Sequence, residues 1–289
     1  MIPLRRVRGS GSINTQFFGV QLEDISFELA KTQRSIKKGD ITKHSFKSSI
    51  WKKAKEQLLK ESNDKCAYCE TPMSVVSYGD VEHYRPKSKY WWLAYCLDNY
   101  LASCAICNQK FKSAHFKVEG GKMPSPRVRR NSADSTLKNI SKALVPDPLI
   151  AADVMRFENK HRAELALLIN PYVDDPTITF AWHADRNLEE VDLVAVSSDF
   201  SVVKRVDAAK EFYGLDRPQL RGLRYATFHD YFVNKVTLED PSINQNTRMV
   251  NEDAIKRKLR GSSPYAGMIR FFENVGNPED WITDGWFTV

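Results

Sequence analysis

The chain has 289 residues, of which 42% are hydrophobic, so it is long enough for one large domain or two modest ones with a substantial core. No stretch approaches the roughly 18 consecutive apolar residues of a membrane span, and the basic N-terminus lacks an apolar signal core, which predicts a cytoplasmic protein with no membrane partner. The net charge is +7, with an excess of +8 in residues 1–60, another +8 in residues 83–130, and −9 in the rest.

The basic residues are therefore clustered toward the front of the chain. Clustered Lys and Arg favour a polyanionic partner such as nucleic acid, because neutralised phosphates release counterions, although two solvated faces explain the charge equally well. Within residues 41–62, Ile50, Ala54 and Leu58 recur at helical spacing with lysines on the other faces. This pattern predicts a basic amphipathic helix within a basic N-terminal segment, residues 1–65.

Four of the five cysteines form two Cys-x-x-Cys pairs, Cys66 with Cys69 and Cys104 with Cys107, separated by 34 residues. Each pair can turn both thiolates toward one point, and two pairs complete a tetrahedral site for a structural Zn²⁺. A disulfide needs an oxidising compartment, and a thioredoxin-like motif would leave one pair unexplained. The fifth, Cys96, lies in an apolar-aromatic stretch and is predicted to be a small buried hydrophobe.

The interval between the pairs is longer than the about 15–20 residues of a plain zinc ribbon. The stretch YGDVEHYRPKS predicts a turn at Gly79, a short strand through Val81 and His83, and a break at Pro86. A second strand is expected in CLDNYLASC, and CAICNQKFKS leads from the second cysteine pair into a helix. The predicted order is strand, long connection, strand, cysteine knuckle, helix.

The remaining chain divides into two parts. Residues 117–148 are rich in Gly, Pro, Ser and Arg and predict a basic mobile loop. Residues 149–289 predict a mainly helical C-terminal lobe with a small hairpin in TITFAWHADRNLEEVDLVAV and helical patterns from about Val203, one of them beginning at Pro218. The sequence contains no P-loop or Gly-rich nucleotide fingerprint, so any use of ATP must come from a partner.

The motifs between the cysteine pairs resemble the HNH (ββα-metal) endonuclease family. The family's acidic-His dipeptide matches Glu82-His83, its middle Asn matches Asn99 in LDNYL, and its third position, directly after the second cysteine pair, matches Asn108. Flanking Cys-x-x-Cys pairs that bind a structural zinc are common in this family. The resemblance implies an α+β fold with a zinc-framed ββα-metal nuclease core over residues 66–116, between the basic N-terminal segment and the mostly helical C-terminal region.

A narrower resemblance extends over about residues 41–235. The segments VEHYRPKS, WWLAY, NYLASCAICNQKFKSAHF, LLINPYVDDP and AAKEFYGLDRPQLRGLR look like those of HNH proteins encoded beside an ATPase in Septu-type and retron-linked anti-phage systems. This similarity implies an ABC/SMC-like ATPase partner and a role as the effector of a defence complex. It further implies that the isolated chain has weak activity, which assembly controls.

Phosphodiester cleavage needs an activated nucleophile and stabilisation of the charge that develops on the phosphate. His83, neutral near pH 7, is the predicted general base. Glu82 and Asn108 supply hard oxygen ligands suited to a catalytic Mg²⁺ or Mn²⁺, with Asp80 as a competitor for the role of Glu82. Neighbours on a strand point to opposite faces, so Glu82 and His83 share one site only if the backbone bends. Asn99 is expected to hold the loop that bears His83.

The basic residues around this motif are the predicted substrate contacts: Arg85, Lys87, Lys110 and Lys112. A solvated surface charge explains each of them equally well. The chemistry does not require a 2′-hydroxyl, so DNA is favoured as the substrate, with RNA as the other candidate. The alternative function is a non-catalytic zinc module that binds nucleic acid or a partner protein, but such a module has no need for an acidic-His pair and two Asn residues at these positions.

Overall fold

The computed structural model describes residues 1–73, 79–275 and 278–283. The N-terminal part of the chain is helical. The sequence predicts one helix over residues 41–62, but the helical structure begins only at Ser48. In residues 41–47 the rings of His44 and Phe46 stack on each other instead, and the Lys47 amide donates to Tyr95 Oη at 2.7 Å. The elements here are η1 (Thr15–Phe17), α1 (Gly19–Lys38), α2 (Ser48–Trp51), η2 (Lys52–Ala54) and α3 (Lys55–Glu61).

A two-stranded antiparallel sheet carries the predicted motif. Strand β1 (Asp80–His83) pairs with β2 (Tyr100–Ser103) so that His83 lies opposite Tyr100. Every residue of β2 is buried, because the sheet is covered on both faces. The connection contains the short turns η3 (Trp91–Leu93) and η4 (Leu97–Asn99), and β2 leads through the second cysteine pair into η5 (Ile106–Lys112), a π-helix. The order of elements agrees with the order predicted from the sequence.

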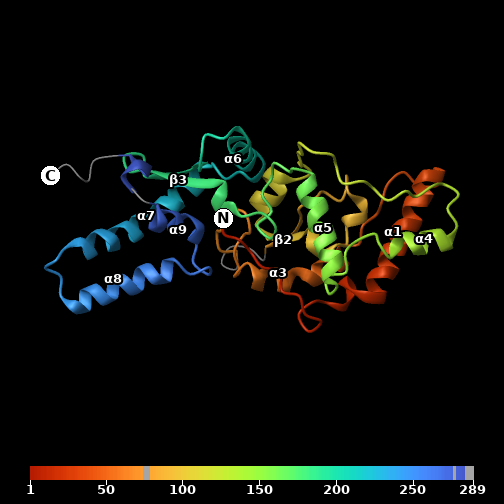
Figure 1. The fold of residues 1–289 in the computed structure, drawn as a ribbon, viewed down its shortest axis with the longest axis horizontal. Helices are drawn as coiled ribbons and strands as arrows, with labels where there is room; N and C mark the ends of the chain where they lie inside the picture. The colour runs from red at the N-terminus through yellow and green to blue at the C-terminus, as the bar shows by residue number, and fades with distance from the viewer. Residues whose placement is uncertain (74–78, 276–277, 284–289) are drawn as a thin grey trace.

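Residues 117–148 differ from the predicted mobile loop. They contain α4 (Asp134–Ser141), which lies beside α1 at one end of the molecule (Figure 1). Leu137 of α4 is fully buried, in a small cluster with Ala30 of α1 and Val128. Asp134 also pairs with Arg34 at 2.6 Å. An apolar stripe on α4 thus docks part of this basic segment onto the first helix.

Helix α5 (Ala151–Ala163) packs against the region of the β1–β2 sheet, although the sequence groups it with the C-terminal lobe. The ring of its His161 stacks on Tyr84, which directly follows β1, with 5.3 Å between the centroids. The hydroxyl of Tyr84 donates to the carbonyl of Leu168 at 2.5 Å. The boundary between the two halves of the molecule therefore lies after α5.

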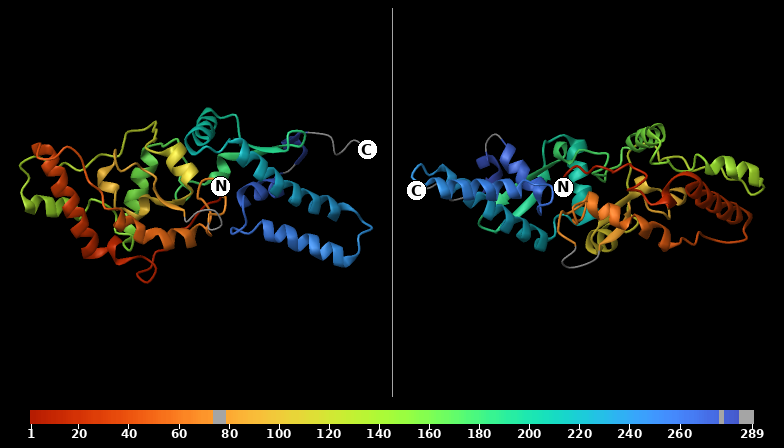
Figure 2. Two further views of the ribbon diagram at one scale, coloured as in Figure 1. Left: turned by 180° about the vertical axis from the view of Figure 1, so that it is seen from behind. Right: turned by 90° about the horizontal axis from the view of Figure 1, so that it is seen from below.

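The C-terminal lobe contains the hairpin and the helices that the sequence predicts. Strand β3 (Phe180–Asp185) pairs antiparallel with β4 (Glu190–Ala195), and β5 (Ile282–Thr283) adds a parallel edge to β3. Helix α7 (Pro218–Glu239) extends away from the first half of the chain, and α8 (Gln245–Lys258) runs back along it (Figure 2). The other elements are η6 (Pro176–Ile178), α6 (Phe200–Tyr213), α9 (Ala266–Asn274) and η7 (Pro278–Trp281).

Contacts between the two halves involve η5, which lies against α6, and the segment around the first cysteine pair. Tyr68, between Cys66 and Cys69, stacks on Tyr213 of α6 with 3.8 Å between the ring centroids. Lys65 Nζ donates to the carbonyl of Ser263, between α8 and α9, at 2.7 Å. The fold is mixed α+β, as predicted. Among the described residues, none of the helices has the length and apolar character needed to span a membrane.

Candidate functional site

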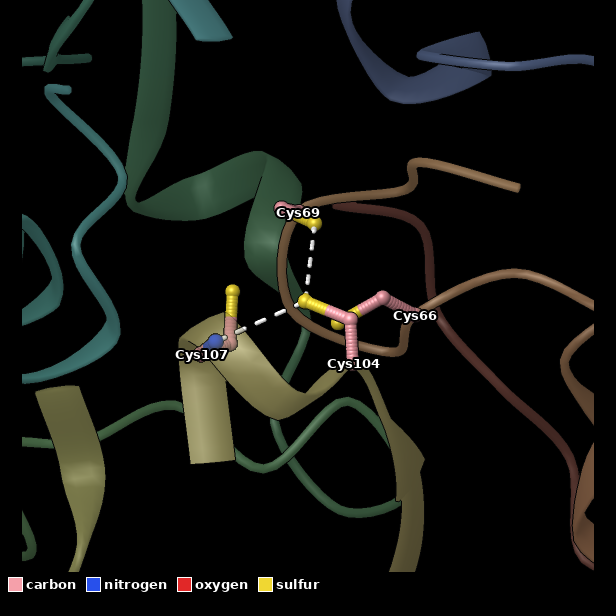
Figure 3. Close-up of side chains that lie close together, drawn as sticks. All are labelled: Cys66, Cys69, Cys104 and Cys107. Atoms are coloured by element: carbon pink, nitrogen blue, oxygen red, sulfur yellow. Dashed lines mark hydrogen bonds between the residues drawn. The ribbon is translucent and has the colours of Figure 1, made fainter. Parts of the chain in front are cut away.

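The four predicted zinc ligands converge at one point. Their Sγ atoms all lie within 4.8 Å of one another, and none forms a disulfide (Figure 3). A tetrahedral ion about 2.3 Å from each sulfur places the sulfurs roughly 3.8 Å apart. The 4.0 Å between Cys69 Sγ and Cys104 Sγ is close to that value, and the Cys107 amide donates to Cys104 Sγ at 3.4 Å. The donor set fits a structural zinc ion.

Side chains from the C-terminal lobe surround this cysteine cluster. Arg217, directly before α7, donates from Nη1 to Cys107 Sγ at 3.7 Å. Thr71 Oγ1 contacts Cys69 Sγ at 3.3 Å and lies 3.2 Å from Tyr265 Oη. A cation and hydroxyl groups near thiolates offset their negative charge and orient them. Arg217 and Tyr265 lie more than 100 residues from the cysteines in the sequence, and no local motif marks them.

A cleft of about 610 Å³ opens beside β1. Glu82, His83 and Asn108 all line it, together with Lys87. The acidic-His dipeptide at the end of β1 and the amide at the start of η5 therefore reach one cavity, although 25 residues separate His83 from Asn108. This is the arrangement that the predicted catalytic site requires.

His83 is held as a neutral base. Its Nε2 lies 3.0 Å from the carbonyl oxygen of Ala94, which can only accept a hydrogen bond, so Nε2 carries the proton and Nδ1 keeps the lone pair. The ring packs edge-on against Trp51 and Tyr100, with centroids 5.1 and 5.0 Å away. Burial, aided by the charge of Lys87, lowers the pKa of His83 to about 3, so the imidazole is neutral near pH 7.

Asn99 is fully buried behind the cleft and uses both ends of its amide. Its Oδ1 accepts from the Arg85 amide at 2.8 Å, and its Nδ2 donates to the carbonyls of Arg85 and Leu93 at 3.0 and 3.3 Å. These bonds tie the start of β2 to the loop that follows His83. The predicted scaffolding role requires contacts of this kind.

Asp80, Glu82 and Asn108 form polar contacts around β1. Asn108 Nδ2 donates to Asp80 Oδ2 at 3.1 Å. Glu82 Oε1 pairs with the ammonium of Lys112, which also donates to the His83 carbonyl at 2.9 Å. Burial raises the pKa of Glu82, and the charge of Lys112 opposes that shift. Carboxylate and amide oxygens are the ligands that hard divalent ions prefer, and Asp80, Glu82 and Asn108 carry such oxygens on and beside β1.

Two of the predicted substrate contacts are not at the surface. The Lys112 and Arg85 side chains are fully buried. Arg85 Nε donates to Glu164 Oε2 at 2.6 Å, and Lys112 is paired with Glu82 as described above. A buried charge requires a partner, which explains both pairs, and neither cation can reach a phosphate in this arrangement. Arg85 and Lys112 are therefore structural cations and not substrate contacts.

The other two predicted substrate contacts keep accessible side chains. Lys87 is half-buried and lines the cleft, with Nζ 5.3 Å from the centroid of the Trp51 ring. Lys110 is exposed on η5 and is not among the residues that line the cleft. Of the four predicted substrate contacts, Lys87 is thus the one whose position suits contact with a substrate phosphate in the cleft.

Comparison with known proteins gives two relatives. Septu protein PtuB of Bacillus mycoides (strain KBAB4) is 36% identical over 91 residues, covering 27% of this chain and 31% of the relative. Septu protein PtuB of Bacillus thuringiensis is 38% identical over 94 residues, covering 32% of this chain and 33% of the relative. The chain spans about a third of the length of the curated relatives it matches.

No family model matches the chain, and no solved structure matches it. Both relatives carry the Septu name. The chain is thus similar to Septu proteins PtuB, which confirms the Septu-type relationship that its sequence motifs predict.

Proposed function

We propose that this chain is a metal-dependent, HNH-type endonuclease that hydrolyses phosphodiester bonds in nucleic acid, with DNA as the favoured substrate and RNA as the other. The observation that carries the proposal is the single cleft lined by His83, Glu82 and Asn108. In the Nε2–H tautomer, His83 can accept a proton at Nδ1 from an attacking water. The four cysteines beside this cleft support a structural zinc in the same module.

The remaining roles follow from the positions of the side chains. Glu82 and Asn108, with Asp80 next to them, would hold a Mg²⁺ or Mn²⁺ ion, which when bound polarises the phosphate and stabilises the leaving oxygen. Asn99 keeps the loop after His83 in place. Lys87 would contact a phosphate at the cleft.

We further propose that the chain is the effector of an anti-phage defence complex with an ABC/SMC-like ATPase. The similarity to two Septu proteins supports a role in defence. The chain itself has no P-loop, so ATP would be bound by the partner. Co-purification with the neighbouring ATPase and comparison of cleavage with and without it tests this proposal. Strong sequence-independent cleavage by the chain alone would count against control by assembly.

Substitution of His83 tests the catalytic assignment. His83→Ala is expected to reduce metal-dependent nicking by about 10²–10⁴-fold, the usual contribution of a general base. His115→Ala is a matched control, because His115 is exposed and does not line the cleft. A non-catalytic zinc module would retain its biological activity in His83→Ala and lose it in Cys104→Ser through unfolding. Unchanged cleavage in His83→Ala would eliminate the nuclease assignment.

A further inference from the structure

An aromatic surface adjoins the proposed catalytic cleft. Phe46 and Trp51 line the cleft together with His83. The ring of His44 stacks on Phe46, with 5.4 Å between centroids and 9° between planes, and on Trp91, with 5.1 Å and 11°. The three nearly parallel rings of Phe46, His44 and Trp91 thus continue outward from the cleft. We define these residues and Trp51 as the aromatic ledge.

All four side chains of the aromatic ledge are half-buried. Packing accounts for their inner contacts, such as the stack of Trp51 on Tyr95 with 6.3 Å between centroids. It does not account for the ring surface left open at the mouth of a cleft. The His44 ring lies between Phe46 and Trp91, so the faces that remain for a base in this stack are the outer faces of Phe46 and Trp91, and unpaired bases stack on aromatic faces of this kind.

The charges around the aromatic ledge suit a nucleic acid backbone. Lys47 and Lys52 flank its rings in the sequence, and both are exposed. Lys87 places its ammonium 5.3 Å from the centroid of Trp51, inside the cleft. A strand whose bases stack on the rings would therefore carry its phosphates past cations and toward His83. Rows of aromatic rings within a basic groove are the usual design of single-strand binding surfaces.

We propose that the cleft selects single-stranded nucleic acid, or an unpaired stretch of a longer molecule, by stacking its bases on the aromatic ledge. This inference rests on the proposed nuclease function and names its substrate class. In a duplex the base faces are covered by neighbouring pairs, so a duplex can contact the surface through its backbone and its base edges but cannot stack its bases on the rings. The aromatic ledge therefore contributes to binding of a single strand and little to binding of a duplex.

The first test varies the substrate and leaves the protein unchanged. The probes are a labelled thymidine 20-mer, an abasic strand of the same length and charge, and a 20-base-pair duplex, all at one salt concentration. Stacking of even one base predicts that the wild-type chain binds the abasic strand roughly 5- to 150-fold more weakly than the thymidine strand. Equal affinity for these two strands would overturn the proposal, because it would leave only phosphate contacts.

The second test varies the protein. Phe46→Leu keeps an apolar side chain at the cleft and removes the aromatic face without altering the contacts of His83. It is expected to weaken binding of the thymidine strand by a similar factor and to leave duplex binding unchanged. Phe200→Leu is the matched control, because Phe200 is 73% exposed on α6 and is not among the residues that line the cleft. Equal losses for single strand and duplex, or no loss, would refute the proposal.

The same reagents separate failure of this inference from failure of the nuclease assignment. If the wild-type chain nicks both substrates and Phe46→Leu affects them equally, the nuclease stands and the selection of single strands is wrong. If no substrate is cut but Phe46→Leu still loses only single-strand binding, the aromatic ledge stands and the nuclease is wrong. His83→Ala should keep the wild-type preference for single strands and lose cleavage.

Discussion

At the scale of single residues, Asn99 shows how one buried amide positions a reactive side chain. It satisfies both the amide and the carbonyl of Arg85, two residues after His83, and so closes the loop against β2. Local side-chain to backbone bonds of this kind replace the ladder bonds that a strand would otherwise provide. Asn99 therefore fixes the direction in which the chain leaves β1 and the depth at which His83 enters the cleft.

Removal of the Asn99 amide is expected to cost both stability and activity. Asn99→Ala leaves the Arg85 amide and carbonyl buried without partners, at about 1–3 kcal/mol for each group. Urea denaturation measures the loss, and nicking assays at a temperature where the variant is folded measure the effect on His83. Asn99→Asp is the graded control, because it keeps the acceptor for the Arg85 amide and loses the donor. Full stability in Asn99→Ala would refute the scaffolding role.

At the scale of elements, the loop after β1 is joined to the end of α5 by a buried ion pair. Glu164 accepts from Arg85 at 2.6 Å, from the Tyr90 hydroxyl at 2.8 Å and from the Met123 amide at 2.7 Å. One carboxylate thus joins three segments that are distant in the sequence. Both charged partners are buried, so the pair defines how these segments fit together more than it adds net stability.

A double substitution separates the cost of a buried, unpaired charge from the net stability that the ion pair adds. Glu164→Ala is expected to destabilise the protein by about 3–5 kcal/mol, because it leaves the Arg85 cation buried and unpaired. Arg85→Met combined with Glu164→Leu removes both charges and should be much less destabilising. Chemical denaturation of the single and double variants measures the difference. Equal losses in the two proteins would show that the charge of Arg85 is not the cause.

The contact between α5 and the sheet region also makes stability depend on pH. Burial lowers the pKa of His161, although the Asp174 carboxylate, 3.9 Å from His161 Nε2, opposes that shift. The unfolded chain, with a His pKa near 6.5, therefore takes up the proton first as the pH falls. The contribution of His161 to the free energy of unfolding is constant above about pH 6.5 and decreases below it, by at most about 1.4 kcal/mol per pH unit.

Substitution by a residue that does not titrate checks this dependence. Urea denaturation of the wild type and of His161→Gln between pH 7.5 and 5 should give a shallower fall for the variant, whatever its absolute stability. Glutamine keeps a polar side chain beside Asp174 and carries no titrating group. Parallel curves for the two proteins would show that His161 is not the source of the acid sensitivity.

At the scale of the whole molecule, the cysteine cluster lies where the two halves meet. The cluster contains Cys66 and Cys69, which follow α3, and Cys104 and Cys107, which follow β2. Arg217 of the C-terminal lobe donates a hydrogen bond to Cys107. A bound zinc would therefore stabilise the contact between the halves as well as the knuckles themselves. Metal binding that depends on folded ligands contributes its free energy directly to folding.

Loss of zinc should consequently destabilise both halves of the chain. We expect one zinc per chain, and Cys104→Ser or a chelator should lower the free energy of unfolding by several kcal/mol. Cys96→Ser is the matched control, because Cys96 is buried and lies outside the cluster. It should retain the metal and lose only the smaller contribution of a buried thiol. Zinc analysis and thermal unfolding measure both effects, and full zinc content in Cys104→Ser would exclude the assignment.

Those parts of the protein that depend on local spacing can be predicted from its sequence. Two residues between paired cysteines bring their thiolates together, so the spacing predicts the four candidate zinc ligands. A turn-bounded or alternating pattern indicates a short strand, so the order of β1, β2 and η5 is predicted as well. The Septu-type relationship was likewise predicted from contiguous motifs, and the two relatives confirm it.

Which side chains are buried and which segments meet became evident only in the three-dimensional fold. Arg85 and Lys112 look like surface cations in the sequence, but packing buries them beside Glu164 and Glu82. The docking of α4 on α1 and the approach of Arg217 to Cys107 likewise join residues that are about 100 positions apart. The physical reason is that burial and the partner of a charge depend on which surfaces pack together, whereas local spacing constrains only the backbone within a few residues.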